Sequence, residues 1–243
     1  MKHQDKVVFV TGAGQGMGRA IVQRFAAEGA KVAAIDINQD AAADTAASCE
    51  GEVIAIACDI ANSESVKGAM QQVKEVFGRL DVVINNAGTG SVDAFLDTPD
   101  ENWDRVIGVN LKGTFLCCRE GARLMRENGG GAIINVSSSA AVSGEGPSHY
   151  VASKAGVMGL TRSIARELAP NGIRVNTLVP GATNTPMMQG IPEEWMQQMI
   201  SAIPLGRMAE PDDVAKVASF LASDDAGFIT GQNIAVNGGM VFI

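Results

Sequence analysis

The chain has 243 residues, of which 46% are hydrophobic and 19% charged, and its formal net charge at pH 7 is −8. This length is enough for one α/β domain with a large core, and the acidic balance argues against nucleic acid or an anionic membrane as a partner. No apolar run approaches a membrane span, and the run after the polar first six residues is too short for a signal peptide. We therefore expect a cytoplasmic protein.

The cysteines and histidines argue against a metal centre. No two cysteines have C-x-x-C spacing, and only two histidines are present. These spacings do not form a zinc site, and free thiols in a reducing cytoplasm are the expected state of the cysteines. The residues concerned are Cys49, Cys58, Cys117, Cys118, His3 and His149.

The first apolar run is followed at once by a glycine-rich turn. Residues 7–10 read Val-Val-Phe-Val, which predicts a strand buried on both faces, and a helical pattern follows the turn. The strict G-x-G-x-x-G spacing fails, because Met17 and Arg19 stand where the last glycine would fall. The turn instead reads T-G-x-x-x-G-x-G over residues 11–18. Strand, glycine turn and helix together favour a site for the phosphates of a dinucleotide.

The second predicted strand ends at Asp36, which lies 18 residues after Gly18. An acid near this spacing accepts hydrogen bonds from the adenosine ribose hydroxyls and repels a 2′-phosphate. Position 37 is Ile and position 15 is Gln, so no arginine is present there to bind such a phosphate. The pattern therefore favours NAD over NADP. An alternative is that Asp36 or Asn38 caps the next helix.

Strand and helix patterns alternate along the whole chain without a linker or repeat. This alternation predicts an α/β fold: a single Rossmann-type doubly wound domain over residues 1–243, with a seven-stranded parallel sheet flanked by helices. The predicted strands are 7–10, 31–35, 53–58, 81–84, 132–136, 173–179 and 233–236, and the longer predicted helices include 98–127 and 150–168.

A tyrosine and a lysine four residues apart are candidates for acid/base catalysis. Tyr150 is the only tyrosine, and on a helix its side chain and that of Lys154 lie on one face. A nearby ammonium favours the phenolate, so we expect Lys154 to lower the pKa of Tyr150 and make it an acid/base near neutrality. Alone, the pair also fits an ordinary surface helix.

Two further stretches are expected to serve this pair. Asn110 is an unfavourable residue inside the predicted helix 98–127, which suggests a local opening of the helix for a water molecule. Three serines, at 137–139, follow the fifth strand and place a hydroxyl near the tyrosine. The methionine-rich stretch within 183–205 is interpreted as a substrate-binding lid, although methionine at helical spacing also packs in cores.

Taken together, these motifs resemble the short-chain dehydrogenase/reductase family over nearly the full chain. The motifs that carry the resemblance are Thr11-Gly12-x-x-x-Gly16-x-Gly18, Asp59, Asn85-Asn86-Ala87-Gly88, Asn110, Ser138, Tyr150-x-x-x-Lys154, Pro180-Gly181 and Thr230-Gly231-Gln232.

The resemblance implies roles for these positions. Tyr150 would exchange a proton with the substrate oxygen, and Lys154 would lower its pKa and hold the nicotinamide ribose. Ser138 would hydrogen-bond the substrate oxygen, and Asn110 would hold a water in a proton relay. The implied cofactor residues are Gly12, Gln15, Gly16, Met17, Gly18, Asp36, Ile37, Asp59, Ile60, Asn86, Ala87, Gly88, Tyr150, Lys154, Pro180, Gly181, Thr183 and Thr185. Relatives are often homotetramers, which we also expect here.

The substrate pocket is expected to be apolar and uncharged, which suits a small neutral alcohol or ketone. The expected pocket residues are Gly90, Ser138, Gly144, Glu145, Met187, Met188, Trp195 and Met199.

Three departures from the family pattern matter. The serine-to-tyrosine spacing is one residue short, so Ser137 is an alternative to Ser138. Thr183 stands where Ile or Val is usual, which weakens its contact with the carboxamide of nicotinamide. Asn237 replaces an aspartate of the family pattern, which concerns subunit packing.

The leading hypothesis is an NAD-dependent oxidoreductase that interconverts a secondary alcohol and a ketone. One alternative is a 3-oxoacyl-thioester reductase acting on acyl-carrier protein or coenzyme A, although carrier-protein enzymes usually prefer NADPH and carry basic residues where this chain has Pro170-Asn171-Gly172. Another is a non-catalytic nucleotide-sensing protein on the same fold.

Overall fold

A computed structural model describes residues 1–188 and 191–243 and shows seven parallel strands in one sheet, in the order β3-β2-β1-β4-β5-β6-β7. The strands are β1 (Val7–Thr11), β2 (Lys31–Asp36), β3 (Val53–Ala57), β4 (Val82–Asn85), β5 (Gly131–Val136), β6 (Ile173–Pro180) and β7 (Asn233–Val236). The predicted fold class, sheet and strand positions are confirmed.

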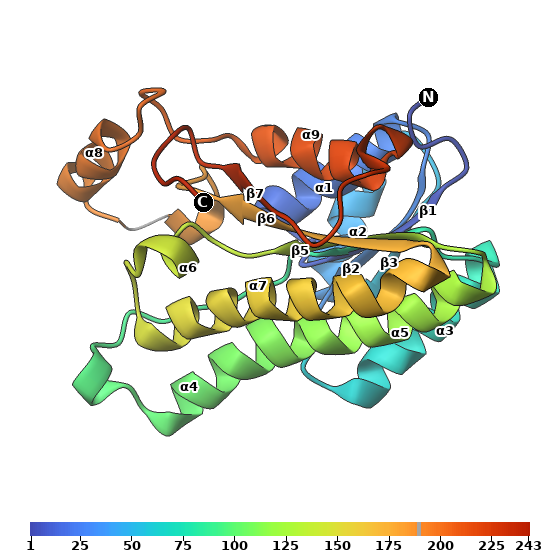
Figure 1. Ribbon diagram of the computed structural model, residues 1–243, viewed down its shortest axis with the longest axis horizontal. Helices are drawn as coiled ribbons and strands as arrows, with labels where there is room; N and C mark the ends of the chain where they lie inside the picture. The colour runs from blue at the N-terminus through green and yellow to red at the C-terminus, as the bar shows by residue number, and fades with distance from the viewer. Residues whose placement is uncertain (189–190) are drawn as a thin grey trace.

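Helices cover both faces of the sheet (Figure 1). The first face carries α1 (Gly16–Ala27), α2 (Gln39–Ala47) and α9 (Pro211–Ala222), and the second carries α3 (Ser63–Phe77), α4 (Asp100–Ile107), α5 (Thr114–Glu127) and α7 (Ser148–Leu168). Two short helices, α6 (Ala140–Ser143) and α8 (Glu193–Ser201), are both found at the same end of the sheet (Figure 1).

Each face of the sheet has its own apolar core. The strands β1, β2 and β4 are buried on both sides, so their sequences are mainly continuous apolar runs rather than alternating ones. Phe25 of α1 and Val214 of α9 belong to the cluster on the first face. Val73 of α3 and Leu116 of α5 belong to the cluster on the second. Burial from both sides makes the sheet a rigid support for the loops at its ends.

The strand order reverses between β1 and β4, and polar side chains join these strands beyond their carboxyl ends. The Asn86 side chain donates to the carbonyl oxygens of Thr11 and Gly12 at 3.0 and 3.2 Å. The Thr11 hydroxyl accepts from the backbone N–H groups of Asn86 and Ala87 at 3.1 and 3.0 Å. A reversal of strand order opens a crevice at this edge, which is where such folds bind ligands.

The predicted helix 98–127 is interrupted. It begins at α4, passes through a π-helical turn, η2 (Gly108–Gly113), and continues as α5. Asn110 lies within this turn, where the Thr114 hydroxyl donates to its carbonyl oxygen at 2.7 Å. The helix is therefore irregular at Asn110, as its sequence indicates, since a π-turn departs from the regular α-helical ladder; the opening for a water molecule stays a prediction.

None of the helices in the described parts of the chain is long and apolar enough to cross a membrane. Across residues 1–188 and 191–243, no group of three or more histidine, cysteine, aspartate or glutamate side chains forms a metal-binding cluster. All four cysteines are free thiols. In the single chain, the apolar C-terminal residues Phe242 and Ile243 are exposed.

Candidate active site

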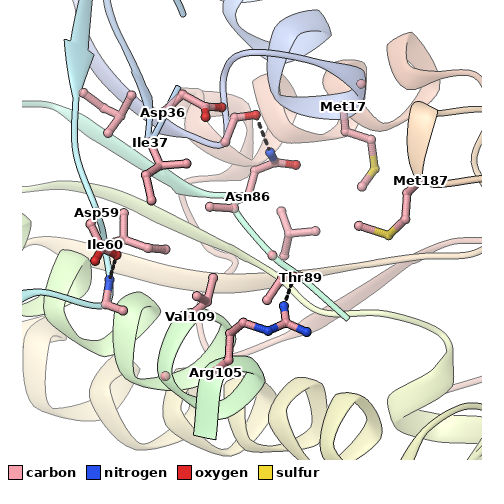
Figure 2. Close-up of a pocket in the computed structure, with 18 of the residues that line it drawn as sticks. Met17, Asp36, Ile37, Asp59, Ile60, Asn86, Thr89, Arg105, Val109 and Met187 are labelled. Atoms are coloured by element: carbon pink, nitrogen blue, oxygen red, sulfur yellow. Dashed lines mark hydrogen bonds between the residues drawn. The ribbon is translucent and has the colours of Figure 1, made fainter. Parts of the chain in front are cut away.

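A cavity of about 760 Å³ lies at the carboxyl ends of the strands, beside the point where the strand order reverses. Figure 2 shows Asp36 and Ile37 at one side of it, Met17 and Met187 at another, and Thr89, Val109 and Arg105 below them. The predicted residues that line the cavity are Gly12, Gln15, Gly16, Met17, Asp36, Ile37, Asp59, Ile60, Asn86, Ala87, Gly88, Tyr150, Lys154, Thr185 and Met187.

The glycine turn brings bare backbone to the cavity wall. Gly12 and Gly16 adopt φ angles of +65° and +54°, which favour glycine. A Cβ atom on Gly18 would lie 1.9 Å from the carbonyl oxygen of Gly12, so only glycine allows α1 to pack this close to the turn. Gly18 thus shapes the turn without lining the cavity.

The start of α1 is suited to an anion. Its N-cap, Gln15, makes no side-chain capping bond, and its first turn holds no acidic residue. By contrast, Asn38 and Asn62 cap α2 and α3, and each of those helices has an acid in its first turn. Uncapped N–H groups and the positive end of the helix dipole face the cavity, which fits the pyrophosphate of a dinucleotide.

Asp36 lies at the end of β2 with its carboxylate at the cavity. Its two oxygens accept from the backbone N–H groups of Gly14 at 2.8 Å and Asn38 at 3.0 Å. Asn38, not Asp36, caps α2 by accepting from Ala41. These backbone bonds hold the carboxylate in place, and an ionised carboxylate has further lone pairs for ribose hydroxyls.

Tyr150, Ser138 and Lys154 converge at another part of the site. The Tyr150 ring packs against the backbone of Gly90, where a Cβ atom on the glycine would lie 3.6 Å from the ring, and its hydroxyl hydrogen-bonds Ser138. The Lys154 Nζ lies 5.9 Å from the Tyr150 ring centroid and donates to the carbonyl oxygen of Val136 at 2.9 Å. Helix α7 carries the tyrosine and lysine one turn apart, as predicted.

Burial shifts the pKa values of both residues. It raises the pKa of the Tyr150 phenol above its ordinary value, and the hydrogen bond with Ser138 opposes this rise. Burial also lowers the pKa of Lys154 from 10.5 to about 8. From the sequence we expect Lys154 to lower the pKa of Tyr150, whereas in the structure burial raises that pKa. Loss of hydration disfavours the phenolate, and the ammonium is directed at the Val136 carbonyl.

The two candidate serines have different partners. The buried Ser137 hydroxyl donates to the carbonyl oxygen of Lys154 at 2.7 Å, which ties β5 to α7. Ser138 is less buried, accepts from the N–H of Ala140 at 3.2 Å and reaches Tyr150. Ser137 is the serine that lines the cavity, but its proton is donated to the Lys154 carbonyl oxygen. Ser138 does not line the cavity, but it is the serine that reaches the Tyr150 hydroxyl, so the hydrogen bonds favour Ser138 as the group that meets a substrate oxygen.

Asn110 is buried, and both the oxygen and the nitrogen of its side-chain amide are hydrogen-bonded. Its Oδ1 accepts from the N–H of Thr89 at 2.8 Å, and its Nδ2 donates to the carbonyl oxygen of Thr89 at 2.9 Å and to Ser153 at 3.0 Å. A Cβ on Gly88 would lie 3.2 Å from Lys154 Nζ and 3.4 Å from Asn110 Oδ1, so these groups meet at Gly88. In the structure Asn110 thus holds the loop after β4; its water-holding role stays a prediction.

Several predicted residues lie outside the cavity wall, including Ser138 and Gly90, which contact the wall residue Tyr150. Pro180 is buried at the end of β6, Gly181 packs against Asn237, and Thr183 is buried with its hydroxyl on the Gly181 carbonyl. Glu145 and Trp195 are exposed. Gly144 lines a separate hollow, and Met188, in η4 (Pro186–Met188), and Met199 of α8 are also away from the cavity wall. Residues 189 and 190 of the predicted lid are outside the described residues.

Sequence reasoning missed the second wall of the cavity, which comes from α4 and η2. Arg105 donates to the Thr89 hydroxyl at 2.6 Å and to the carbonyl oxygen of Gly90 at 3.3 Å (Figure 2). The missed lining residues include Thr89, Asp104, Arg105, Gly108, Val109 and Lys112. Their approach to β1 and β2 depends on packing between segments far apart in the sequence, so no local pattern predicted it.

Residues 12–241 match a family model described as enoyl-(acyl carrier protein) reductase. The chain is 43% identical over 253 residues to a (3R)-3-hydroxyacyl-CoA dehydrogenase of Rattus norvegicus, covering 99% of this chain and 98% of the relative. It is 40% identical over 245 residues to the 3-oxoacyl-(acyl-carrier-protein) reductase FabG of Thermotoga maritima, covering 99% and 100%.

A solved structure has the same architecture. A short-chain type dehydrogenase/reductase from Mycobacterium marinum is 34% identical and superposes with a TM-score of 0.94, covering 100% of this chain and 98% of its own. The full-length agreement in sequence and fold shows that the chain belongs to the short-chain dehydrogenase/reductase family of oxidoreductases, which act on hydroxyl and keto groups with a nicotinamide cofactor.

Proposed function

We propose that the protein is an NAD-dependent oxidoreductase that interconverts a 3-hydroxyacyl thioester of coenzyme A and the corresponding 3-oxoacyl thioester. The observation that carries the proposal is that Tyr150 and Lys154 line the same cavity as Asp36, with Ser138 beside the Tyr150 hydroxyl. The first three residues suit a carbonyl or carbinol group, and Asp36 suits an unphosphorylated ribose.

The charge of Asp36 supports NAD over NADP. Its carboxylate is fixed at the cavity by the Gly14 and Asn38 N–H groups, so it would meet a 2′-phosphate directly. Two negative charges brought into direct contact repel each other. The neighbour Ile37 is exposed and apolar and offers no countercharge.

A thioester substrate is supported by the relatives. Both named curated relatives act, by their names, on a 3-hydroxyacyl or 3-oxoacyl group joined to coenzyme A or to acyl-carrier protein. The formal net charge of −8 disfavours docking of an acidic carrier protein. The segment Pro170-Asn171-Gly172 also offers no basic side chain, and it lies at the amino end of β6, away from the cavity. Coenzyme A is therefore the proposed carrier.

The proposed mechanism assigns the proton transfer to Tyr150. When bound, a nicotinamide cofactor would accept a hydride from the carbinol carbon or supply one to the carbonyl carbon. In the reductive direction the Tyr150 hydroxyl gives its proton to the substrate oxygen, while Ser138 donates a hydrogen bond to that oxygen. Lys154 provides positive charge one helical turn away, and Asn110 holds the Thr89 backbone beside it.

The directions of the pKa shifts predict how the rate depends on pH. Burial raises the pKa of Tyr150, so its phenol is protonated at neutral pH and is ready to act as an acid. Oxidation requires the phenolate as a base, so the oxidation rate should rise with pH from 6 into the alkaline range. A flat profile with hydride transfer rate-limiting would contradict the assignment of Tyr150.

The test is to follow NADH formation with a 3-hydroxyacyl-CoA and with matched free secondary alcohols, each with NAD⁺ and NADP⁺. We expect turnover of the CoA thioester with NAD⁺. Turnover of simple neutral alcohols but not of thioesters would return the assignment to a small-alcohol dehydrogenase. Preference for NADP⁺ and a carrier-protein thioester would overturn both the Asp36 and the carrier arguments.

We also propose that the protein assembles as a homotetramer, and sedimentation velocity checks this.

A further inference from the structure

The loop after β4 has little apolar packing of its own. Val92, Phe95 and Leu96 are 98%, 75% and 91% exposed. The same loop forms one side of the Tyr150 ring through Gly90. Because apolar burial does not fix this loop, its position beside the reacting hydroxyl depends on polar contacts.

Three of these contacts come from α4 and the π-turn. Asn110 holds both backbone groups of Thr89, Arg105 donates to Thr89 and Gly90, and Asn102 donates to Asp93 at 2.9 Å. These bonds attach the loop to the second wall of the cavity, not to the helix that carries Tyr150.

The fourth contact joins the loop directly to α7. His149 Nε2 bonds the Ser91 hydroxyl at 2.5 Å, and Ser91 donates to Asp93 Oδ2 at 2.5 Å. Ser91 has one proton and gives it to the carboxylate, so the His149 Nε2 carries a proton and donates. Within the described residues, this is the side-chain hydrogen bond that links residues 88–97 directly to α7.

His149 is built into the helix beside the catalytic candidate. It is 0% exposed and immediately precedes Tyr150. Its other ring nitrogen, Nδ1, is buried without a hydrogen-bond partner among the described residues. Burying such a group costs free energy. An apolar side chain would avoid that cost, whereas histidine makes the hydrogen bond to Ser91.

We propose that His149 is a positioning residue: through Ser91 and Asp93 it holds the loop over the Tyr150 ring and keeps the phenol aligned for proton transfer. The charged end of the chain, Asp93, strengthens both bonds, because a hydrogen bond to a carboxylate polarises the serine that accepts from the histidine. The proposal gives the Asp93–Ser91–His149 chain a role in the rate of the reaction.

A matched pair of variants separates positioning from filling space. H149Q can place an amide N–H near the position of Nε2, whereas H149L fills the site without a donor. S91A removes the acceptor from a partly buried loop position and provides a second route if H149L does not fold. H3L is the control, since His3 is the other buried histidine and bonds Ser219 away from the cavity.

The first readout does not depend on activity. Tyr150 is the only tyrosine, so the near-ultraviolet phenolate absorbance titrates this residue alone. A loosened loop admits water and relieves the burial that raises the pKa of Tyr150. We expect a downward shift in H149L and S91A, and titration like the wild type in H149Q and H3L. Wild-type titration in both H149L and S91A would overturn the proposal, whatever the substrate is.

The second readout rests on the proposed function. Single-turnover hydride transfer with the CoA thioester should fall about ten- to 100-fold in H149L and S91A, since small misplacements of reacting groups have effects of this size. H149Q should recover most of the rate, NADH affinity should change little, and H149L/S91A should lose no more than either single variant. Equal losses in H149Q and H149L, or additive losses in the double variant, would overturn positioning. An inactive wild type would instead reject the proposed substrate and leave the titration to decide.

Discussion

The two histidines of the protein lie in similar hydrogen-bond networks on different faces of the sheet. His149 bonds Ser91, which donates to Asp93, and His3 bonds Ser219 at 3.1 Å, which donates to Glu28 at 2.5 Å. Both rings are buried. The same trio of histidine, serine and carboxylate therefore occurs twice, and its residue types alone do not say what it does.

The surroundings of the two hydrogen-bond networks differ. His3 packs against Phe25 of α1, with ring centroids 4.5 Å apart, and its partner Ser219 belongs to α9. It thus ties the N-terminal segment to two core helices. His149 adjoins Tyr150 and ties a loop that forms part of the site. The His3 network contributes to stability. We propose that the His149 network contributes to the rate of the reaction, because only this network has a reactive group as its neighbour.

The largest effect should come from the reactive group itself. Y150F removes the proton donor and leaves the ring packing against Gly90 intact, so turnover should fall at least about 100-fold with little change in melting temperature. Steady-state rates and thermal unfolding of the same samples check this. Retained turnover would remove the difference between the two histidine regions, since neither would then adjoin a catalytic group.

The next largest effect should be a gain in stability at the site. Burial lowers the pKa of Lys154 from 10.5 to about 8, which corresponds to about 3 kcal/mol at neutral pH. K154M removes that cost and loses the bond to Val136, so it should stabilise the protein by roughly 2 kcal/mol at pH 7 while turnover falls.

The sign of this effect is set by proton binding. The unfolded chain binds the Lys154 proton more tightly than the folded protein, so wild-type stability rises as pH increases from 8 to 10.5, and the advantage of K154M shrinks over that window. Urea unfolding at several pH values measures it. A destabilised K154M at pH 7 would show that Lys154 contributes more to the fold than its burial costs.

A smaller effect is expected at the nucleotide side of the cavity. D36N removes the charge but keeps an oxygen that accepts from a backbone N–H. We expect about a tenfold loss in NADH affinity and a narrower gap between NADH and NADPH, the scale of one hydrogen bond to a charged group. Fluorescence titration with both nucleotides measures this. Unchanged preference would mean that Asp36 only supports the Gly14 turn and Asn38.

The smallest effect should come from His3 and should appear only in stability. Burial lowers the pKa of His3 below 6.5, and the nearby Glu28 opposes this. The folded state therefore resists protonation, so stability is complete above pH 6.5 and declines as pH falls through the lowered pKa. H3L should lack this decline and keep wild-type turnover. A pH-independent wild type between pH 7.5 and 5, or a slower H3L, would break the contrast with His149.

Local sequence patterns determined most of the fold. The central strands β1 and β4 are short apolar runs rich in β-branched residues, and burial on both faces favours such runs. The turn at Gly12 and Gly16 has backbone angles that favour glycine, so its sequence marks its conformation. Helical spacing likewise puts Tyr150 and Lys154 on one face of α7, whatever packs against that face.

Only the tertiary structure decided the environment of those residues. The direction of the Tyr150 pKa shift depends on how much water the surrounding segments exclude, and the sequence-based expectation had the opposite sign. The second wall of the cavity, with Arg105 and Val109, and the tie from His149 to Ser91 join segments 16 to 58 residues apart. Periodicity and spacing report a chain's neighbours along its length, whereas burial and hydrogen bonding at this site are set by neighbours across space.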